Sequence, residues 1–166
     1  ILDHKRSFNK AYNLLLTKKN NKNLFEKEEI KEKIIKRYDH KKWKKTQGLV
    51  YGKFIRSECE VYPGFKEFCV YASLLGHKIF IISHKTKTGH YLSKRINLRK
   101  EAEKVLKIKL GDVYKNINKI HFCDTFNKKI ELIKKYKPDI VVDDLEDVLV
   151  ALKNNSQKIL FKEGLS

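Results

Sequence analysis

The sequence has no methionine, only two prolines and seven glycines among 166 residues, and no long apolar run. A membrane-spanning helix needs roughly 18–20 consecutive apolar residues, and no segment approaches that length. Residues 1–5 do not have the design of a signal peptide. Few prolines and glycines leave little sequence for linkers, so one main domain is expected. We therefore predict a soluble, cytoplasmic protein without a membrane partner.

Cysteine is also scarce, and its pattern excludes two classes of protein. The three cysteines, Cys59, Cys69 and Cys123, are odd in number and have no spacing typical of metal ligands. A free cysteine behaves as a small core residue. We predict three buried free thiols, and neither a disulfide framework nor a cysteine metal site.

Acidic residues are outnumbered, since 20 Asp and Glu stand against 38 Lys and Arg, which gives a net charge of +18. A clustered basic surface favours nucleic-acid binding because it releases counterions from phosphates. Here the lysines are spread along the chain and are accompanied by many Asn and Ile residues. Codon bias toward A and T produces this composition without selection for binding. Only residues 40–45 (HKKWKK) combine lysines with an aromatic residue, and a solvated helix face explains this segment equally well. The composition therefore gives little reason to expect nucleic acid as a partner.

The pattern of apolar residues predicts alternating helices and strands. Helical spacing indicates helices over residues 5–16, 26–37, 65–75, 97–109, 112–118, 126–136 and 145–153. Apolar runs bounded by turn residues indicate strands over residues 77–83, 120–124, 140–143 and 157–161. This alternation is typical of an open α/β sheet with right-handed crossovers, whose ligand crevice lies at the carboxyl ends of the strands.

The strand over residues 140–143 ends in paired carboxylates, Asp143 and Asp144, and Asp147 follows one helical turn later. Such carboxylates repel each other and are expensive to keep ionised unless a cation neutralises them. Mg²⁺ prefers oxygen ligands, so we predict that Asp143, Asp144 and Asp147 hold Mg²⁺. The alternative is that Asp143 caps the next helix while Asp144 is solvated.

A hydroxyl and an amine also lie at predicted strand or helix ends. Ser83 ends the apolar run of residues 79–82, where a hydroxyl and nearby backbone N–H groups can bind phosphate oxygens. The alternative role of Ser83 is that of a turn former. His84 and Lys85 follow directly, and we expect them to contact the same substrate. Lys129 lies in the first turns of the helix leading to the carboxylate strand, so its ammonium can balance a bound dianion.

This combination resembles the haloacid dehalogenase superfamily of hydrolases, most of which are Mg²⁺-dependent phosphatases. The resemblance covers nearly the whole chain. Ile81-Ile82-Ser83 is similar to the second family motif, Lys129 to the third, and Val141-Val142-Asp143-Asp144 with Asp147 to the fourth. A poorly characterised bacterial branch of the superfamily is similar in residues 47–52 (QGLVYG), 62–64 (YPG), 83–87 (SHKTK) and 143–145 (DDL).

The resemblance implies a fold and a mechanism. Residues 61–166 should form an open, mostly parallel Rossmann-like sheet with helices on both faces, and residues 5–60 a small helical cap that excludes water and selects the substrate. An aspartate attacks the phosphorus of a small phosphorylated substrate, and water hydrolyses the aspartyl-phosphate that results. In this reaction Ser83 binds a phosphoryl oxygen and Lys129 stabilises the developing charge.

The first motif of the family, an apolar strand ending in Asp-x-Asp, is absent from the sequence. Residues 1–3 (ILD) resemble the segment that trails this motif, and no later aspartate has the required spacing. Together with the absence of methionine, this predicts a chain truncated just after the nucleophile, without the first central strand and inactive alone. The alternative is a non-catalytic binding or regulatory domain of the same fold, which could hold nucleic acid on its basic surface.

Three aromatic residues in the expected cap leave two roles open. Tyr38, Trp43 and Tyr51, with the lysines beside them, either face a phosphorylated ligand or pack within the helical unit. The superfamily fold serves many substrates, so the sequence does not identify the phosphate ester.

Overall fold

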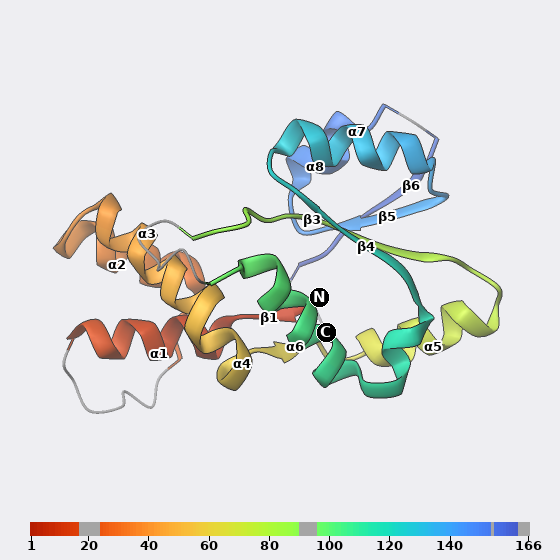
Figure 1. Ribbon diagram of the computed structural model, residues 1–166. Helices are drawn as coiled ribbons and strands as arrows, with labels where there is room; N and C mark the ends of the chain where they lie inside the picture. The colour runs from red at the N-terminus through yellow and green to blue at the C-terminus, as the bar shows by residue number, and fades with distance from the viewer. Residues whose placement is uncertain (17–23, 90–95, 154, 163–166) are drawn as a thin grey trace. The chain divides into compact units, whose positions relative to one another are not determined.

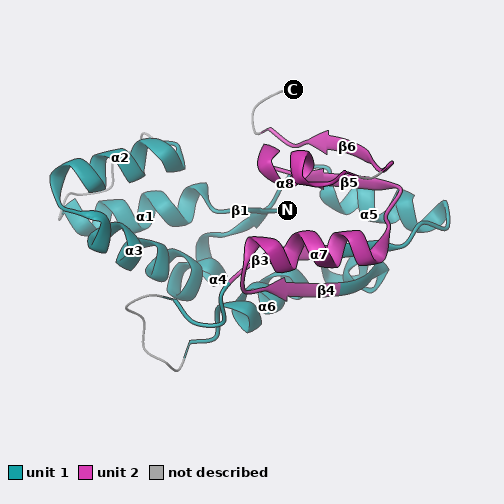
Figure 2. Ribbon diagram, turned by 90° about the horizontal axis from the view of Figure 1, so that it is seen from above, with its two compact units in different colours: residues 1–80, 86–119 teal, residues 81–85, 120–166 magenta. Residues whose placement is uncertain are grey.

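The structure, a computed structural model, describes residues 1–16, 24–89, 96–153 and 155–162. These residues belong to two compact units, shown in Figure 2. Unit 1 consists of Ile1–Phe80 and Thr86–Lys119, and unit 2 consists of Ile81–Lys85 and Ile120–Ser166. Helices and short strands alternate along the chain (Figure 1), so the predicted α/β class is confirmed. The division predicted between residues 60 and 61 stays a prediction.

Unit 1 is mainly helical. Its helices are α1 (Lys5–Leu16), α2 (Lys27–Arg37), α3 (His40–Leu49), the π-helical η1 (Val50–Phe54), α4 (Ile55–Glu58), α5 (Phe65–Leu74), α6 (Leu98–Leu110) and the 3-10 helix η2 (Gly111–Asn116). Two short strands, β1 (Leu2–Asp3) and β2 (Glu60–Val61), pair antiparallel. Among the described residues, no helix combines the length and apolar content that crossing a membrane requires.

Local sequence explains where the helices of unit 1 begin and end. Glu26 and Glu29 form a capping box at the start of α2. The Asp39 side chain accepts a hydrogen bond from the backbone N–H of Lys42 and caps α3. Gly111, with a φ of 57°, follows α6 in a conformation that favours glycine. Each of these caps and breaks involves residues only a few positions apart in the sequence.

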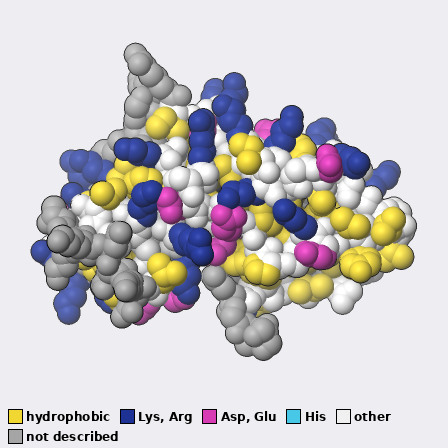
Figure 3. All heavy atoms as spheres, turned by 90° about the horizontal axis from the view of Figure 1, so that it is seen from below, with side chains coloured by type: hydrophobic (Ala, Val, Ile, Leu, Met, Phe, Trp, Pro, Cys, Tyr) yellow, Lys and Arg dark blue, Asp and Glu magenta, His cyan; other side chains and the backbone are white. Residues whose placement is uncertain are grey.

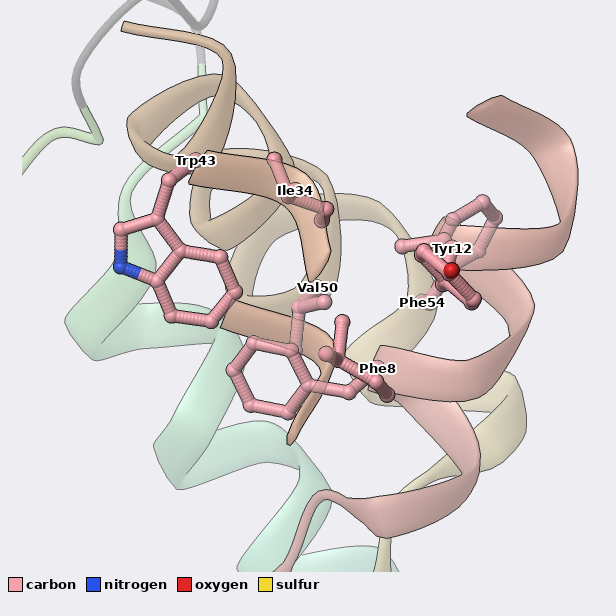
Figure 4. Close-up of a cluster of buried hydrophobic side chains, with 8 residues drawn as sticks. Phe8, Tyr12, Ile34, Trp43, Val50 and Phe54 are labelled. Carbon is pink, nitrogen blue, oxygen red and sulfur yellow. The ribbon is translucent and has the colours of Figure 1, made fainter. Parts of the chain in front are cut away.

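The core of α1, α2 and α3 is aromatic and aliphatic. Phe8 and Trp43 stack with ring centroids 5.5 Å apart, and Ile34 and Val50 are fully buried close to them (Figure 4). The remaining buried members of this cluster are Ala11, Tyr12, Ile30 and Phe54. Trp43 is only 6% exposed, so packing inside the helical unit, and not ligand contact, is its role.

Helices α4 and α6 are joined by a two-pronged ion pair. The guanidinium of Arg56 donates from Nε to Oε2 of Glu101 and from Nη2 to Oε1 at 2.8 Å. These hydrogen bonds are the largest influence on the Glu101 carboxyl, and they hold its pKa below the ordinary value although burial opposes them. A carboxyl with a lowered pKa stabilises the fold above its unfolded pKa of about 4.3, and this contribution disappears as pH falls through the folded pKa.

We expect Glu101→Gln to lower the melting temperature at pH 7 by a few degrees, about 2–4 °C for each kcal/mol lost. The difference from the wild type should shrink between about pH 5 and pH 3, because protonation removes the same charge in the wild-type protein. Circular dichroism melts across this pH range measure both effects. Glu103→Gln, an exposed carboxylate on the same helix, is the control. An equal effect of both variants at pH 7 would show that the Arg56 pair contributes nothing special.

Helix α5 has an apolar face that the described residues leave open. Phe68, Tyr71, Leu74 and Leu75 are between 51% and 76% exposed. Apolar side chains gather at the right-hand end of Figure 3, over this helix. Its opposite face packs Cys69 and Ala72 against Ile79.

Unit 2 contains the C-terminal parts of two strands, β3 (Ile79–His84) and β4 (Ile117–Cys123), and the helices and strands that follow β4 in the sequence. These later elements are α7 (Phe126–Tyr136), β5 (Ile140–Asp143), α8 (Glu146–Ala151) and β6 (Gln157–Leu160). Strand β5 pairs parallel with β6, with Asp143 opposite Leu160. Strand β3 pairs with β4.

The β3–β4 pair is also parallel, because matching ends of the two strands meet. The backbone N–H of Ile79, which starts β3, donates to the side chain of Asn118 near the start of β4 at 2.6 Å. The N–H of Lys85, just past β3, donates to the carbonyl of Cys123, the last residue of β4, at 3.0 Å.

The described strands form three separate two-stranded sheets. The α/β class and parallel pairing are therefore established, whereas a continuous Rossmann-like sheet stays a prediction. One predicted element is wrong in part: the helix over residues 112–118 is the 3-10 helix η2, and β4 already begins at Ile117. The physical reason is the pairing with β3, which extends the backbone earlier than the local pattern indicates.

The core of unit 2 lies between α7, α8 and the β5–β6 pair. It is built from Ile130, Ile133, Val141, Val148, Leu149 and Leu152, with Ile82 of β3 packed against it.

All three cysteines are buried free thiols, as predicted. Burial raises the pKa of the Cys69 thiol, which keeps it in the neutral form.

Candidate functional site

Helix α7 places Lys129 beside Asp143. The Thr125 side chain caps the helix by accepting from the backbone N–H of Lys128, and Ile130 and Ile133 anchor it on the core of unit 2. The Nζ atom of Lys129 lies 2.5 Å from Oδ2 of Asp143, at the end of β5. Both side chains are 8% exposed. The structure therefore brings together two of the predicted site residues, 14 positions apart, as a buried ion pair.

The second carboxylate oxygen of Asp143 has a structural partner. Its Oδ1 accepts a hydrogen bond from the backbone N–H of Leu145 at 3.1 Å, immediately before α8 begins. One oxygen of Asp143 thus meets the ammonium of Lys129, and the other supports the turn that leads into α8. Each oxygen keeps a further lone pair, so neither contact by itself prevents Asp143 from binding another group.

The other two predicted metal ligands are in a different environment. Asp144 and Asp147 are exposed, and Asp147 lies in the first turn of α8. No three His, Cys, Asp or Glu side chains among the described residues converge as a metal cage. Mg²⁺, however, commonly takes one or two carboxylates and completes its shell with water and substrate phosphate, so the carboxylate oxygens at this strand end suit it. The metal assignment of Asp143, Asp144 and Asp147 stays a prediction.

Strand β3 carries the remaining predicted residues. Ser83 is half-buried and follows Ile82, which packs on the same core as α7 and β5. The next residue, His84, is exposed, and its Nε2 lies 3.1 Å from the carbonyl oxygen of Asp124. Lys85 binds the end of β4 through its backbone N–H. Within the described residues, no hydrogen bond joins Ser83 to Lys129 or Asp143, so the roles of Ser83, His84 and Lys85 toward a substrate stay predictions.

A pocket that the sequence does not indicate lies at the end of β4. It is lined by Phe122, Cys123, Asp124, Lys128, Glu131, Leu132 and Lys135. Asp124 directly follows a strand, as Asp143 ends one and Ser83 lies near the end of another. This shared position is the sequence feature that could have predicted a contribution of Asp124 to the same region of unit 2.

Fold and geometry together define an α/β protein with a buried lysine–aspartate pair at a strand end. Comparison of the chain with family models, with curated proteins and with solved structures finds no match. Any function must therefore be proposed from the chemistry of these side chains.

Proposed function

We propose that this chain forms the phosphate-receiving part of a Mg²⁺-dependent phosphohydrolase of the haloacid dehalogenase type, acting on a small phosphorylated metabolite. The observation that carries the proposal is the buried contact between Lys129 and Asp143. A buried ion pair is expensive to form and adds little net stability, so apolar residues of the same size could serve the fold as well. An ammonium beside a carboxylate is, in contrast, what recognition of a phosphate and its counter-cation requires.

In the proposed reaction the residues of unit 2 bind and stabilise the phosphoryl group. Lys129 approaches a phosphoryl oxygen and balances the charge that develops there, and the hydroxyl of Ser83 donates a hydrogen bond to a second oxygen. The attacking carboxylate would come from an Asp-x-Asp segment, which the 166 residues do not contain. It forms a bond to phosphorus as the ester oxygen leaves with a proton from the second aspartate of that segment, and water then hydrolyses the aspartyl-phosphate.

A divalent cation has a defined place in this proposal. Asp143 and Asp144 would provide one or two carboxylate ligands, and Asp147 a further one through water. When bound, Mg²⁺ supplies charge neutralisation between the attacking carboxylate and the phosphate. Lys129 would then share Asp143 with the cation, which keeps the Asp143 carboxylate oriented.

The second candidate is a non-catalytic domain of the same architecture. It is favoured by one specific observation: both oxygens of Asp143 already have partners in Lys129 and Leu145. In that case Asp143 would hold α7, β5 and the start of α8 together, and unit 2 would bind no cation at this position.

Hydrolysis of a panel of phosphate esters distinguishes the two candidates. The protein would be expressed with any native residues that precede Ile1 and assayed with Mg²⁺ or with EDTA, with release of phosphate as the measurement. We expect Mg²⁺-dependent turnover of at least one small ester, and weaker substrate binding in Ser83→Ala. The non-catalytic domain would be favoured by two results together. No ester of the panel is hydrolysed, and the circular dichroism spectrum of the protein does not change when Mg²⁺ is added.

A further inference from the structure

The surface of α3 is strongly basic, and this property does not depend on the proposed phosphohydrolase. From residue 40 to residue 57 the chain contains no aspartate or glutamate. The basic side chains in this segment are Lys41, Lys42, Lys44, Lys45, Lys53 and Arg56. Arg56 is bound to Glu101, so the charge concentrates on α3 itself.

The structure shows that these charges lie on one face of the helix. Trp43, Thr46 and Val50 are buried in the α1–α3 core, whereas His40, Lys41, Lys44 and Lys45 are all exposed. At about 100° per residue, the four exposed side chains occupy an arc of roughly 140° opposite the buried ones. We call these four residues the α3 basic face. Because Trp43 stacks on Phe8 in the core, the orientation of the face is fixed within the helical bundle (Figure 4).

Several carboxylates near α3 have partners outside the α3 basic face, whereas Glu32 of α2 is exposed. Glu26 binds Lys5, Glu28 binds Lys31, and Asp39 caps α3 through the backbone of Lys42. The last turn of α2 adds Lys36 and Arg37, both exposed. The potential near the α3 basic face is therefore positive, as expected for a surface that attracts phosphates.

We propose that the α3 basic face binds the phosphate backbone of duplex nucleic acid. The helix is ten residues long, about 15 Å, and a single helix fits the major groove of B-DNA or lies along one phosphate row. Its lysines contact phosphates, so the binding should be independent of base sequence. The sequence alone gave little reason for this expectation, because it showed many lysines but not that they share a face.

Two other polyanionic surfaces fit this face less well. Single strands are held by exposed aromatic rings. Trp43 is buried, and Tyr38, although 42% exposed, has its ring approached by Arg37 and Lys42 at 5.6 and 5.4 Å. A helix that lies on a membrane needs apolar residues directed toward the lipid, whereas those of α3 point into the protein core. Duplex nucleic acid requires only the exposed cations.

The test is fluorescence anisotropy of a short labelled DNA duplex titrated with the 166-residue chain at several salt concentrations. We expect dissociation constants in the non-specific range of about 10⁻⁶ to 10⁻⁴ M, increasing steeply between about 50 and 200 mM salt. The combined variant Lys41→Gln, Lys44→Gln, Lys45→Gln should bind at least tenfold more weakly. Its log–log salt slope should be smaller by about 2 to 3, since roughly 0.9 is lost for each phosphate contact.

A control with the same net charge separates a specific face from general basicity. Lys134→Gln, Lys135→Gln, Lys158→Gln removes three exposed lysines of unit 2 and should bind within twofold of the wild type. Replacing the three α3 lysines by arginine should preserve binding, which guards against a loss due to misfolding. Equal losses in the two glutamine variants, no binding by the wild type at low salt, or tighter binding to single strands or to phosphatidylserine vesicles would each overturn the proposal.

Discussion

Replacement of Lys129 by methionine is expected to lower the free energy of unfolding by about 3–5 kcal/mol. Methionine fills a similar volume but leaves the Asp143 carboxylate, 8% exposed, without its cationic partner. An uncompensated buried charge is costly because the protein interior solvates it poorly. Urea denaturation followed by fluorescence or circular dichroism measures the change.

Two further variants show whether the pair itself is responsible. Lys128→Met changes the exposed neighbour on α7 and should alter stability by no more than about 0.5 kcal/mol. The double variant Lys129→Met, Asp143→Leu removes both charges and should recover most of the loss. If Lys129→Met were no worse than Lys128→Met, the buried contact would not be significant for folding.

Asp143→Asn is expected to reduce Mg²⁺-dependent turnover of the protein that includes its preceding residues by about 10³-fold or more, equivalent to about 4 kcal/mol. The amide retains the shape of the side chain and the acceptor for Leu145, but it removes the charge that a cation and Lys129 both require. The remaining activity should respond less to Mg²⁺. Steady-state phosphate release at a series of Mg²⁺ concentrations provides both values.

A loss of activity through unfolding must be separated from a loss of chemistry. Asp139→Asn, an exposed carboxylate just before β5, is the matched control and should retain full turnover. Thermal melts of Asp143→Asn establish the temperature at which the variant is still folded, and rates are compared there. If turnover and its Mg²⁺ dependence were intact in folded Asp143→Asn, Asp143 would not be a metal ligand in the reaction.

The elements predicted most closely from the sequence are those with local causes. The boundaries of α1 and α7 agree with the predicted residues 5–16 and 126–136, because helical periodicity and the Thr125 cap act over a few positions. Strands β1 and β2, two residues each, were not predicted, since neither has a pattern of its own and they exist only by pairing with each other. Helix α3 was expected only as part of the helical cap over residues 5–60.

The candidate site, like the fold, could be predicted from the sequence only where its contacts are local. Lys129 and Asp143 could be expected to meet because a capped helix connects directly to the strand that ends in Asp143. The position of Ser83 relative to them depends on which strands are neighbours in the sheet, and this order is a property of the whole fold. Whether Asp144 and Asp147 share a cation depends likewise on groups outside the segment that carries them.

The division of the chain also affects the order in which it can fold during synthesis. Residues Ile81–Lys85 belong to unit 2, but they are made before Thr86–Lys119 of unit 1 and before the rest of their own unit. A nascent chain therefore exposes the apolar end of β3 until β4 and α7 have left the ribosome. During that interval this segment is an extended apolar stretch of the kind that chaperones hold.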